Sequence, residues 1–280
     1  MTGANGMLGR AVVERFAARH DVVPHRRTDS DLADLHATVR WILDQHPNHI
    51  VHCAAWTDVD GCESDPERAW RDNTWATRHV ALAAQLAGAS LCHVSTDYVF
   101  DGEKPEPYVE DDPPGPLGVY GETKLAAELE VLRHAPSHWI VRTSWLFGPG
   151  GRNFVRTVAG LLAEREEIRV VDDQRGAPTH VDDVAAGLVA LVDTAAFGTY
   201  HLTNSGDCTW YGLAVAIGSR LGTRCRILPC TSAEYPRPAR RPRNSRLAMR
   251  RWEEAGLPPP RPWQLAVDDY LDTWVREASA

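Results

Sequence analysis

The 280-residue sequence has no long hydrophobic run and no excess of basic residues. Its apolar stretches are broken by charged residues or glycine, well short of the roughly 20 residues that a membrane-spanning helix needs. Lys and Arg total 30 against 38 Asp and Glu, which gives a formal net charge of −8. That balance offers no general attraction to nucleic acid or to anionic membranes. We therefore expect a protein that binds neither.

Cysteine and histidine patterns typical of metal sites or disulfide frameworks are also missing. The six Cys are scattered without a C-x-x-C pair, and the 12 His include no H-E-x-x-H. We therefore predict reduced thiols and no metal. The first residues also lack the basic segment followed by an apolar stretch that marks a secretory signal. These observations together predict a cytoplasmic protein.

The sequence does contain short apolar runs that alternate with amphipathic segments. Runs typical of buried strands lie at 49–53, 90–94 and 139–142, and helix-like segments lie at 8–19, 37–46, 66–88, 121–134, 247–255 and 263–276. This alternation predicts an α/β fold with a doubly wound, Rossmann-like parallel sheet. We expect residues 1–150 to form this core. Residues 151–280 are expected to form mainly a smaller C-terminal substrate-binding lobe, with some segments packing back on the core.

A glycine loop opens the chain, with Gly3, Gly6 and Gly9 three residues apart before the first helix-like segment. Glycine lets backbone N–H groups approach a pyrophosphate, and a helix N-terminus adds partial positive charge. The spacing differs from the G-x-G-x-x-G fingerprint, so a plain turn is the alternative to dinucleotide binding. Only Met1 and Thr2 precede the loop, where a doubly wound sheet needs its central strand. We therefore expect a natural start several residues upstream, or a truncated chain.

The segment after the first helix bears on the choice of cofactor. An expected second strand at 21–23 leads to Arg26 and Arg27. In dinucleotide sites, residues at this place contact the 2′ position of the adenosine ribose. Arginine suits a 2′-phosphate, whereas an acidic residue such as Asp31 suits a 2′-hydroxyl. The paired arginines favour NADPH, with NADH as the alternative, unless both arginines belong to a solvated loop.

Three further residues form a candidate catalytic set. Tyr120 and Lys124 are four residues apart at the start of a helix-like segment, which places both side chains on one face. Thr96 follows an apolar strand at its carboxyl end, where ligands bind in open α/β sheets. A neighbouring ammonium is expected to lower the pKa of the tyrosine, and Thr96 to hold a substrate carbonyl. An exposed Tyr/Lys pair is the alternative, but the chain order of all these motifs favours a site.

Several longer segments carry a family resemblance over nearly the whole chain. They include TGANGMLG (2–9), HCAAWTDVDGCE (52–63), STDYVFDG (95–102), VYGETK (119–124), RTSWLFG (142–148), NFV (153–155), VVDDQRGAPT (170–179) and RPRNSRL (241–247). With these segments the chain resembles the extended short-chain dehydrogenase/reductases and, more narrowly, the dTDP-4-dehydrorhamnose reductase family. The shortened start departs from the family pattern.

The resemblance implies a role for each of three sets of residues. It implies a catalytic triad of Thr96, Tyr120 and Lys124. The residues implied to bind the cofactor are Gly3, Asn5, Gly6, Met7, Leu8, Gly9, Arg26, Asp31, Leu32, Ala54, Ala55, Thr57, Tyr120 and Lys124. The residues implied to bind the substrate are Thr57, Thr96, Tyr98, Trp145, Asn153, Gln174 and Arg243.

The implied reaction is NADPH-dependent reduction of the 4-keto group of a dTDP-linked 4-keto-6-deoxy sugar, and a homodimer is a candidate assembly. The family points first to dTDP-4-dehydrorhamnose. One alternative is a reductase of a related 4-keto nucleotide sugar in an antibiotic deoxysugar pathway, including a dihydrostreptose-type product. A related epimerase or dehydratase is less favoured, because Tyr98 stands where a dehydratase would have an acidic residue. A non-catalytic NADP-binding regulatory subunit is the alternative from another class.

Overall fold

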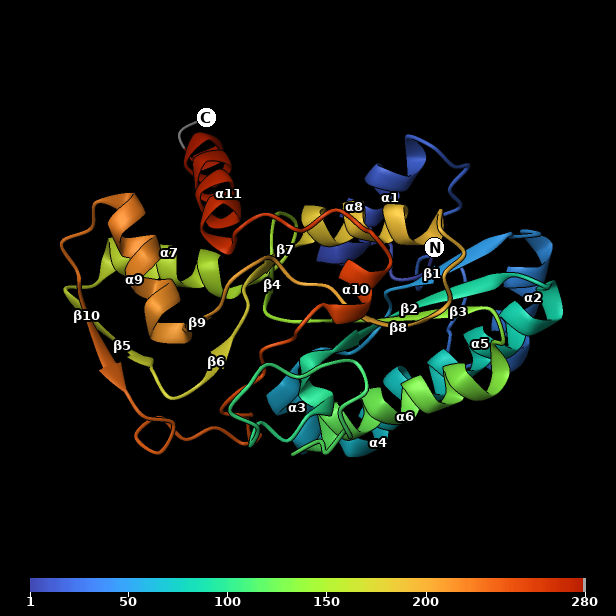
Figure 1. Cartoon of the computed structure of the whole chain (residues 1–280), viewed down its shortest axis with the longest axis horizontal. Helices are drawn as coiled ribbons and strands as arrows, with labels where there is room; N and C mark the ends of the chain where they lie inside the picture. Colours follow the sequence, from blue (N-terminus) through green and yellow to red (C-terminus); the bar gives the residue numbers. More distant parts are fainter. Residues whose placement is uncertain (279–280) are drawn as a thin grey trace.

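The computed structural model describes residues 1–278, and its central element is a parallel sheet in the order β1-β2-β3-β8 (Figure 1). Its strands are β1 (His49–His52), β2 (Ser90–Thr96), β3 (His138–Thr143) and β8 (Gly198–His201). Side chains alternate between the two faces. Ile50, Leu91 and Ile140 pack on one face of the sheet. Their chain neighbours Val51 and Cys92 pack on the other, which is why these strands are apolar throughout.

Helices cover both faces of this sheet, as the doubly wound prediction requires. On one face, α1 (Met7–Ala17) packs against α8 (Val181–Val192). The other face is covered by α2 (Leu35–Asp44), α5 (Ala76–Ala87) and α6 (Val119–His134), which lie together in Figure 1. The Rossmann-like fold is confirmed.

Met1 and Thr2 lie beside β1 at the place of a central strand. Thr2 forms parallel bridges with both His25 and His52, and the Met1 amino group donates to the carbonyl oxygen of Val23 at 3.0 Å. The strand expected at 21–23 is wrong, because the only pairing in that part of the chain is the single bridge at His25.

The long helix expected at 66–88 is divided into three elements. After α3 (Val59–Ser64), the chain forms α4 (Pro66–Ala69), the π-helical segment η1 (Trp70–Trp75) and then α5. Asp65 caps α4 by accepting from the backbone N–H of Arg68, and Pro66 takes the first helical position. The predicted start is therefore confirmed, whereas the π-helical turn was not anticipated.

The second lobe lies beside the carboxyl ends of the sheet strands, on the left of Figure 1. Its elements are β4 (Leu146–Phe147), α7 (Phe154–Glu164), β5 (Glu167–Val171), β6 (Arg175–Gly176), β7 (Thr179–His180), β9 (Cys208–Thr209), α9 (Trp210–Leu221), β10 (Arg226–Cys230) and α11 (Trp263–Ala278). Its core joins apolar side chains of α7, β5, α9 and α11, among them Val158, Ile168, Ile217 and Val267. By contrast, α8, β8 and α10 (Arg250–Glu254) return to the first core.

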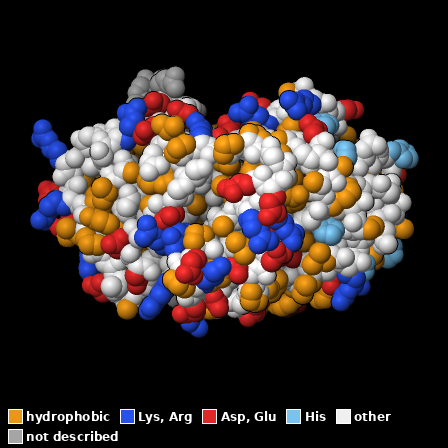
Figure 2. All heavy atoms as spheres, in the orientation of Figure 1, with side chains coloured by type: hydrophobic (Ala, Val, Ile, Leu, Met, Phe, Trp, Pro, Cys, Tyr) orange, Lys and Arg blue, Asp and Glu red, His pale blue; other side chains and the backbone are white. Residues whose placement is uncertain are grey.

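The outer surface carries both signs of charge. On the face drawn in Figure 2, basic and acidic side chains are interspersed. Among residues 1–278, no helix combines the length and the apolar character that crossing a membrane requires. Within the same residues, no group of three or more His, Cys, Asp or Glu side chains is placed to hold a metal ion.

Candidate active site

The glycine loop folds as a tight turn that ends at the N-terminus of α1. Gly3 has a left-handed φ of 72°, and a Cβ there would lie 2.6 Å from the backbone nitrogen of Ala54. A Cβ on Gly9 would collide with the carbonyl oxygen of Gly3. Gly6 is the N-cap of α1 and has no side chain to occupy the first N–H groups of the helix. This close-packed backbone and uncapped helix start fit a pyrophosphate.

A cavity of about 310 Å³ opens between the glycine loop and residues 25–33. The predicted cofactor residues that line it are Gly3, Asn5, Gly6, Arg26, Asp31, Leu32, Ala54 and Ala55. Arg68 also lines this cavity, and its guanidinium carbon lies 4.1 Å from the ring centroid of Trp56. Sequence reasoning did not select Arg68, because α4 reaches the cavity only through the tertiary fold.

Thr96, Tyr120 and Lys124 line a neighbouring cavity of about 380 Å³. Thr96 ends β2, and the other two residues lie one turn apart at the start of α6. That helix begins where the Glu63 carboxylate accepts from the backbone N–H of Val119 at 2.8 Å. The predicted cofactor residues that line the same cavity are Gly3, Gly6, Met7, Leu8, Gly9, Ala55 and Thr57. Thr96, Tyr120 and Lys124 therefore line the same cavity as the glycine loop.

The protonation of Tyr120 differs from the sequence-based expectation. Burial raises the pKa of Tyr120 above its ordinary value, and its hydrogen bond with Thr96 opposes that rise. The expected lowering by Lys124 is wrong, because desolvation of the phenolate is the larger effect. Burial also lowers the pKa of Lys124 to about 8, while the charge of Glu128 acts in the opposite direction. Tyr120 is therefore a neutral phenol at physiological pH, the form that can donate a proton.

Two acceptors from β2 hold the Lys124 ammonium. Its Nζ donates to the carbonyl oxygen of Val94 at 2.8 Å and lies 3.3 Å from Nε2 of His93. Burial and the charge of Lys124 keep the pKa of His93 well below its ordinary value. The imidazole is therefore neutral, and its Nε2 can accept a hydrogen bond from the ammonium, which fixes the direction of the lysine side chain.

Asn73 in η1 connects the segment that follows β1 to α6. Its Oδ1 accepts from the backbone N–H of Trp56 at 2.7 Å, and its Nδ2 donates to the Trp56 carbonyl at 3.2 Å. The same Nδ2 donates to Oγ1 of Thr123 at 3.1 Å, next to Lys124. Sequence reasoning missed Asn73, because a single asparagine within an expected helix gives no sign of these distant partners.

The predicted substrate residues separate into two groups. Thr57, Thr96, Tyr98 and Trp145 line the cavity of the trio. Asn153 lies outside that lining, and its side chain is the N-cap of α7, accepting from the backbone N–H of Arg156 at 2.9 Å.

Gln174 and Arg243 also lie outside the cavity lining, in the second lobe. Gln174 accepts from Nε1 of Trp210 at 3.2 Å and donates to Oγ of Ser232 at 2.8 Å. The Arg243 side chain is exposed. Trp210 does line the cavity although it was not predicted, since a tryptophan at a helix start gives no sequence signal of a ligand.

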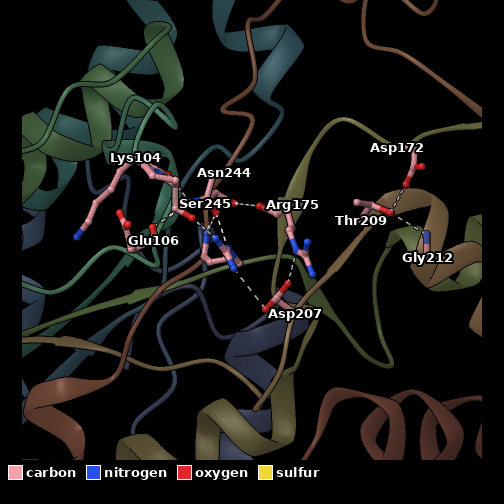
Figure 3. Close-up of polar contacts among 11 residues, drawn as sticks. Lys104, Glu106, Asp172, Arg175, Asp207, Thr209, Gly212, Asn244 and Ser245 are labelled. Atoms are coloured by element: carbon pink, nitrogen blue, oxygen red, sulfur yellow. Dashed lines mark hydrogen bonds and ion pairs between the residues drawn. The ribbon is translucent and has the colours of Figure 1, made fainter.

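Backbone pairing to β6 anchors the segment that carries Arg243. The backbone N–H of Arg175 donates to the Arg243 carbonyl at 2.7 Å, and Ser245 donates to the Arg175 carbonyl at 2.8 Å. Figure 3 shows this contact, with the Arg175 guanidinium paired to Asp207, while Asn244 and Ser245 lie on the neighbouring segment. This backbone pairing thus joins the segment around Arg243 to β6 in the second lobe.

This fold and this site define a class of protein. A Rossmann-like sheet with a glycine loop at the N-terminus of its first helix is the architecture of dinucleotide-binding α/β proteins, and here Thr96, Tyr120 and Lys124 line one cavity beside that loop.

Comparison with known proteins narrows the class to a family. The family model for the RmlD substrate binding domain matches residues 1–276. A dTDP-4-dehydrorhamnose reductase of Streptomyces griseus is 44% identical over 277 residues, covering 96% of this chain and 91% of the relative. The chain therefore belongs to the RmlD family, the family of the dTDP-4-dehydrorhamnose reductases.

Solved structures agree with this assignment. A dTDP-4-dehydrorhamnose reductase of Clostridium acetobutylicum is 38% identical with a TM-score of 0.95, and the match covers 98% of both chains. The enzyme of that name from Bacillus anthracis, solved in complex with NADP, is 37% identical with a TM-score of 0.94, and the match covers 97% of both chains.

Proposed function

We propose that this protein reduces the 4-keto group of dTDP-4-dehydrorhamnose to give dTDP-L-rhamnose, with NADPH as the reductant. One observation carries the proposal. The neutral Tyr120 phenol, Thr96 and the glycine loop line a single cavity in a chain of the RmlD family. The names of the relatives favour this reaction over a secondary-metabolite sugar. The complete trio of side chains weighs against a non-catalytic regulatory subunit.

Cofactor binding is assigned to the glycine loop and to the residues around the 310 Å³ cavity. Gly3, Gly6 and Gly9 would receive the pyrophosphate, and Arg26 with Arg27 would favour the 2′-phosphate of NADPH over NADH. When bound, NADPH supplies the hydride. A lower Michaelis constant for NADPH than for NADH is the expected result, and a clear NADH preference would overturn this assignment.

Each member of the trio has a distinct task in the proposed reaction. Thr96 donates a hydrogen bond to the sugar carbonyl oxygen, on which negative charge develops in the transition state. Tyr120 hands its proton to that oxygen as general acid. Lys124, held by Val94 and His93, places an ammonium near the phenol and stabilises the phenolate that is left behind.

The substrate-side roles of Thr57, Tyr98, Trp145, Asn153, Gln174 and Arg243 remain predictions. Thr57, Tyr98 and Trp145 have the position for direct contact, because they line the cavity of the trio. For Asn153 and Gln174, the hydrogen bonds described above favour a supporting role. Arg243 is free to meet a diphosphate, which a guanidinium recognises in bidentate fashion.

The direct test combines the purified protein with NADPH and dTDP-4-dehydrorhamnose, follows NADPH consumption and identifies the product by NMR. Tyr120→Phe is the matched control, because it removes only the phenolic hydroxyl. Consumption of NADPH with formation of dTDP-L-rhamnose is expected. A folded protein that binds NADPH without turnover would instead support the regulatory-subunit alternative.

Three further predictions complete the proposal. A cytoplasmic location and a homodimer are expected, and fractionation of the producing cells and analytical ultracentrifugation test them. We also propose the division into a cofactor core at 1–150 and a substrate lobe at 151–280. In that division α8, β8 and α10 are the segments that pack back on the core.

A further inference from the structure

Trp145 has a backbone conformation that costs free energy. Its φ is 48°, in the left-handed region that residues other than glycine rarely adopt. Such strain persists only where surrounding contacts fix the residue, and it concentrates at functional sites. The backbone on both sides is fixed. Ser144 donates its hydroxyl to the Ala177 carbonyl at 2.7 Å, and the Trp145 carbonyl accepts from the backbone N–H of Thr179 at 3.2 Å.

The indole of Trp145 is stacked on that of Trp210. Their ring centroids are 3.4 Å apart and the planes differ by 5°. Gly176 lies close to the Trp145 ring, since a Cβ at this glycine would be 2.5 Å from its Cε2 atom. Phe154 packs on Trp210 with a centroid distance of 4.5 Å. The Trp145 ring therefore fits closely against its surroundings, and any side chain at position 176 would collide with it.

The β6–β9 ladder fixes Trp210 itself. Its antiparallel register pairs Arg175 with Thr209, which places Gln174 opposite Trp210. This pairing explains the hydrogen bond from Nε1 of Trp210 to Oε1 of Gln174 at 3.2 Å. Figure 3 shows the second anchor, in which Thr209 donates to Asp172 and accepts from the backbone N–H of Gly212 as the N-cap of α9.

We propose that Trp210 is a positioning residue that fixes the indole of Trp145, whose strained backbone the hydrogen bonds above hold, so that the two indoles form a pre-assembled aromatic wall for the sugar. Both rings line the cavity that contains Thr96 and Tyr120. An indole offers a rigid apolar surface, which suits the C–H groups and the methyl group of a 6-deoxyhexose. The inference rests on the proposed function for the identity of the sugar, whereas the wall itself follows from the contacts.

The test uses Trp210→Ala and Trp210→Phe, with Trp41→Phe as the matched control. Trp41 packs edge-on against His25 and does not line the cavity. Two closely stacked indoles give an exciton couplet in circular dichroism, which both Trp210 variants should lose and the control should keep. Because the Trp145 indole then loses its stacking partner, the KM for the keto sugar should rise roughly tenfold in Trp210→Ala, with kcat changed less than about twofold. The KM for NADPH should not change.

Trp210→Phe keeps a ring against Trp145 but lacks the N–H that Gln174 accepts, so its KM should be intermediate. If Trp210→Ala does not fold, this variant alone carries the test. An unchanged KM in a variant that has lost the couplet would overturn the positioning role. Identical circular dichroism spectra for the wild-type protein and Trp210→Ala would overturn the stacked wall. Failure of the proposed function is distinguishable, because the wild-type protein would then not consume NADPH with the sugar.

Discussion

Neutralising Glu128 should destabilise the protein strongly, because this carboxylate is at the centre of a buried ionic contact behind the active site. Glu128 Oε2 lies 2.7 Å from Nη2 of Arg142, Glu128 Oε1 accepts from Arg142 Nε at 3.0 Å, and Ser95 donates to the same carboxylate at 2.5 Å. The two charged side chains are only 3% and 7% exposed. Ser95 precedes Thr96, and Glu128 lies one turn beyond Lys124 on α6.

Glu128→Gln keeps the shape of the side chain but leaves the Arg142 charge buried without a counter-charge. Breaking a buried pair from one side costs about 3–5 kcal/mol. That is a large share of the roughly 5–15 kcal/mol by which a typical domain is stable. Replacing both partners by apolar residues, Glu128→Leu with Arg142→Met, removes the unpaired charge and should cost less than the single change.

The measurement is the free energy of unfolding in urea, with Glu167→Gln as the matched control. Glu167 is also 2.7 Å from an arginine, Arg226, but its side chain is 36% exposed and that of its partner 74%. An exposed pair of this kind contributes about 0–1 kcal/mol. Equal losses in the two glutamine variants would refute the reasoning, since burial would then have no bearing on the energy of the contact.

The remaining predictions concern the reaction. Tyr120→Phe should lose about 100-fold or more in turnover while NADPH still binds, and near-normal turnover would rule out its role as the acid. The pKa of Lys124 is lowered to about 8, so its ammonium is lost as the pH rises through that value. Turnover should therefore fall above pH 8, and Lys124→Arg, which stays charged, should flatten that limb of the profile. Gly9→Ala should abolish NADPH binding in a fluorescence titration, because the new methyl group would collide with the Gly3 carbonyl.

The parts of the fold that local chemistry specifies were predictable from the sequence. The apolar runs at 49–53, 90–94 and 139–142 became β1, β2 and β3 because all three are buried on both faces. The start of α4 follows from Asp65 and Pro66, which suit a helix start in any context. The π-helical turn did not follow, because Asn73 is held by Trp56 and Thr123, which are distant in sequence.

Prediction of the site worked where residue type and spacing sufficed. Tyr120 and Lys124 share a helix face, and Thr96 ends a strand, so their meeting could be anticipated. The pKa of Tyr120 could not, because desolvation depends on the whole surrounding fold. The contact between Trp145 and Trp210 is likewise invisible in the sequence, since it depends on the β6–β9 register.

The course of the chain between its two lobes has a practical consequence for engineering. Because β8 completes the sheet after the chain has already built α7 and β5, a gene cut at position 150 would encode a first half without one strand of its own sheet. Neither fragment should be expressible as a stable unit. Exchange of sugar preference between related enzymes therefore calls for substitutions of cavity-lining residues such as Thr57 and Tyr98, and not for swapping whole halves.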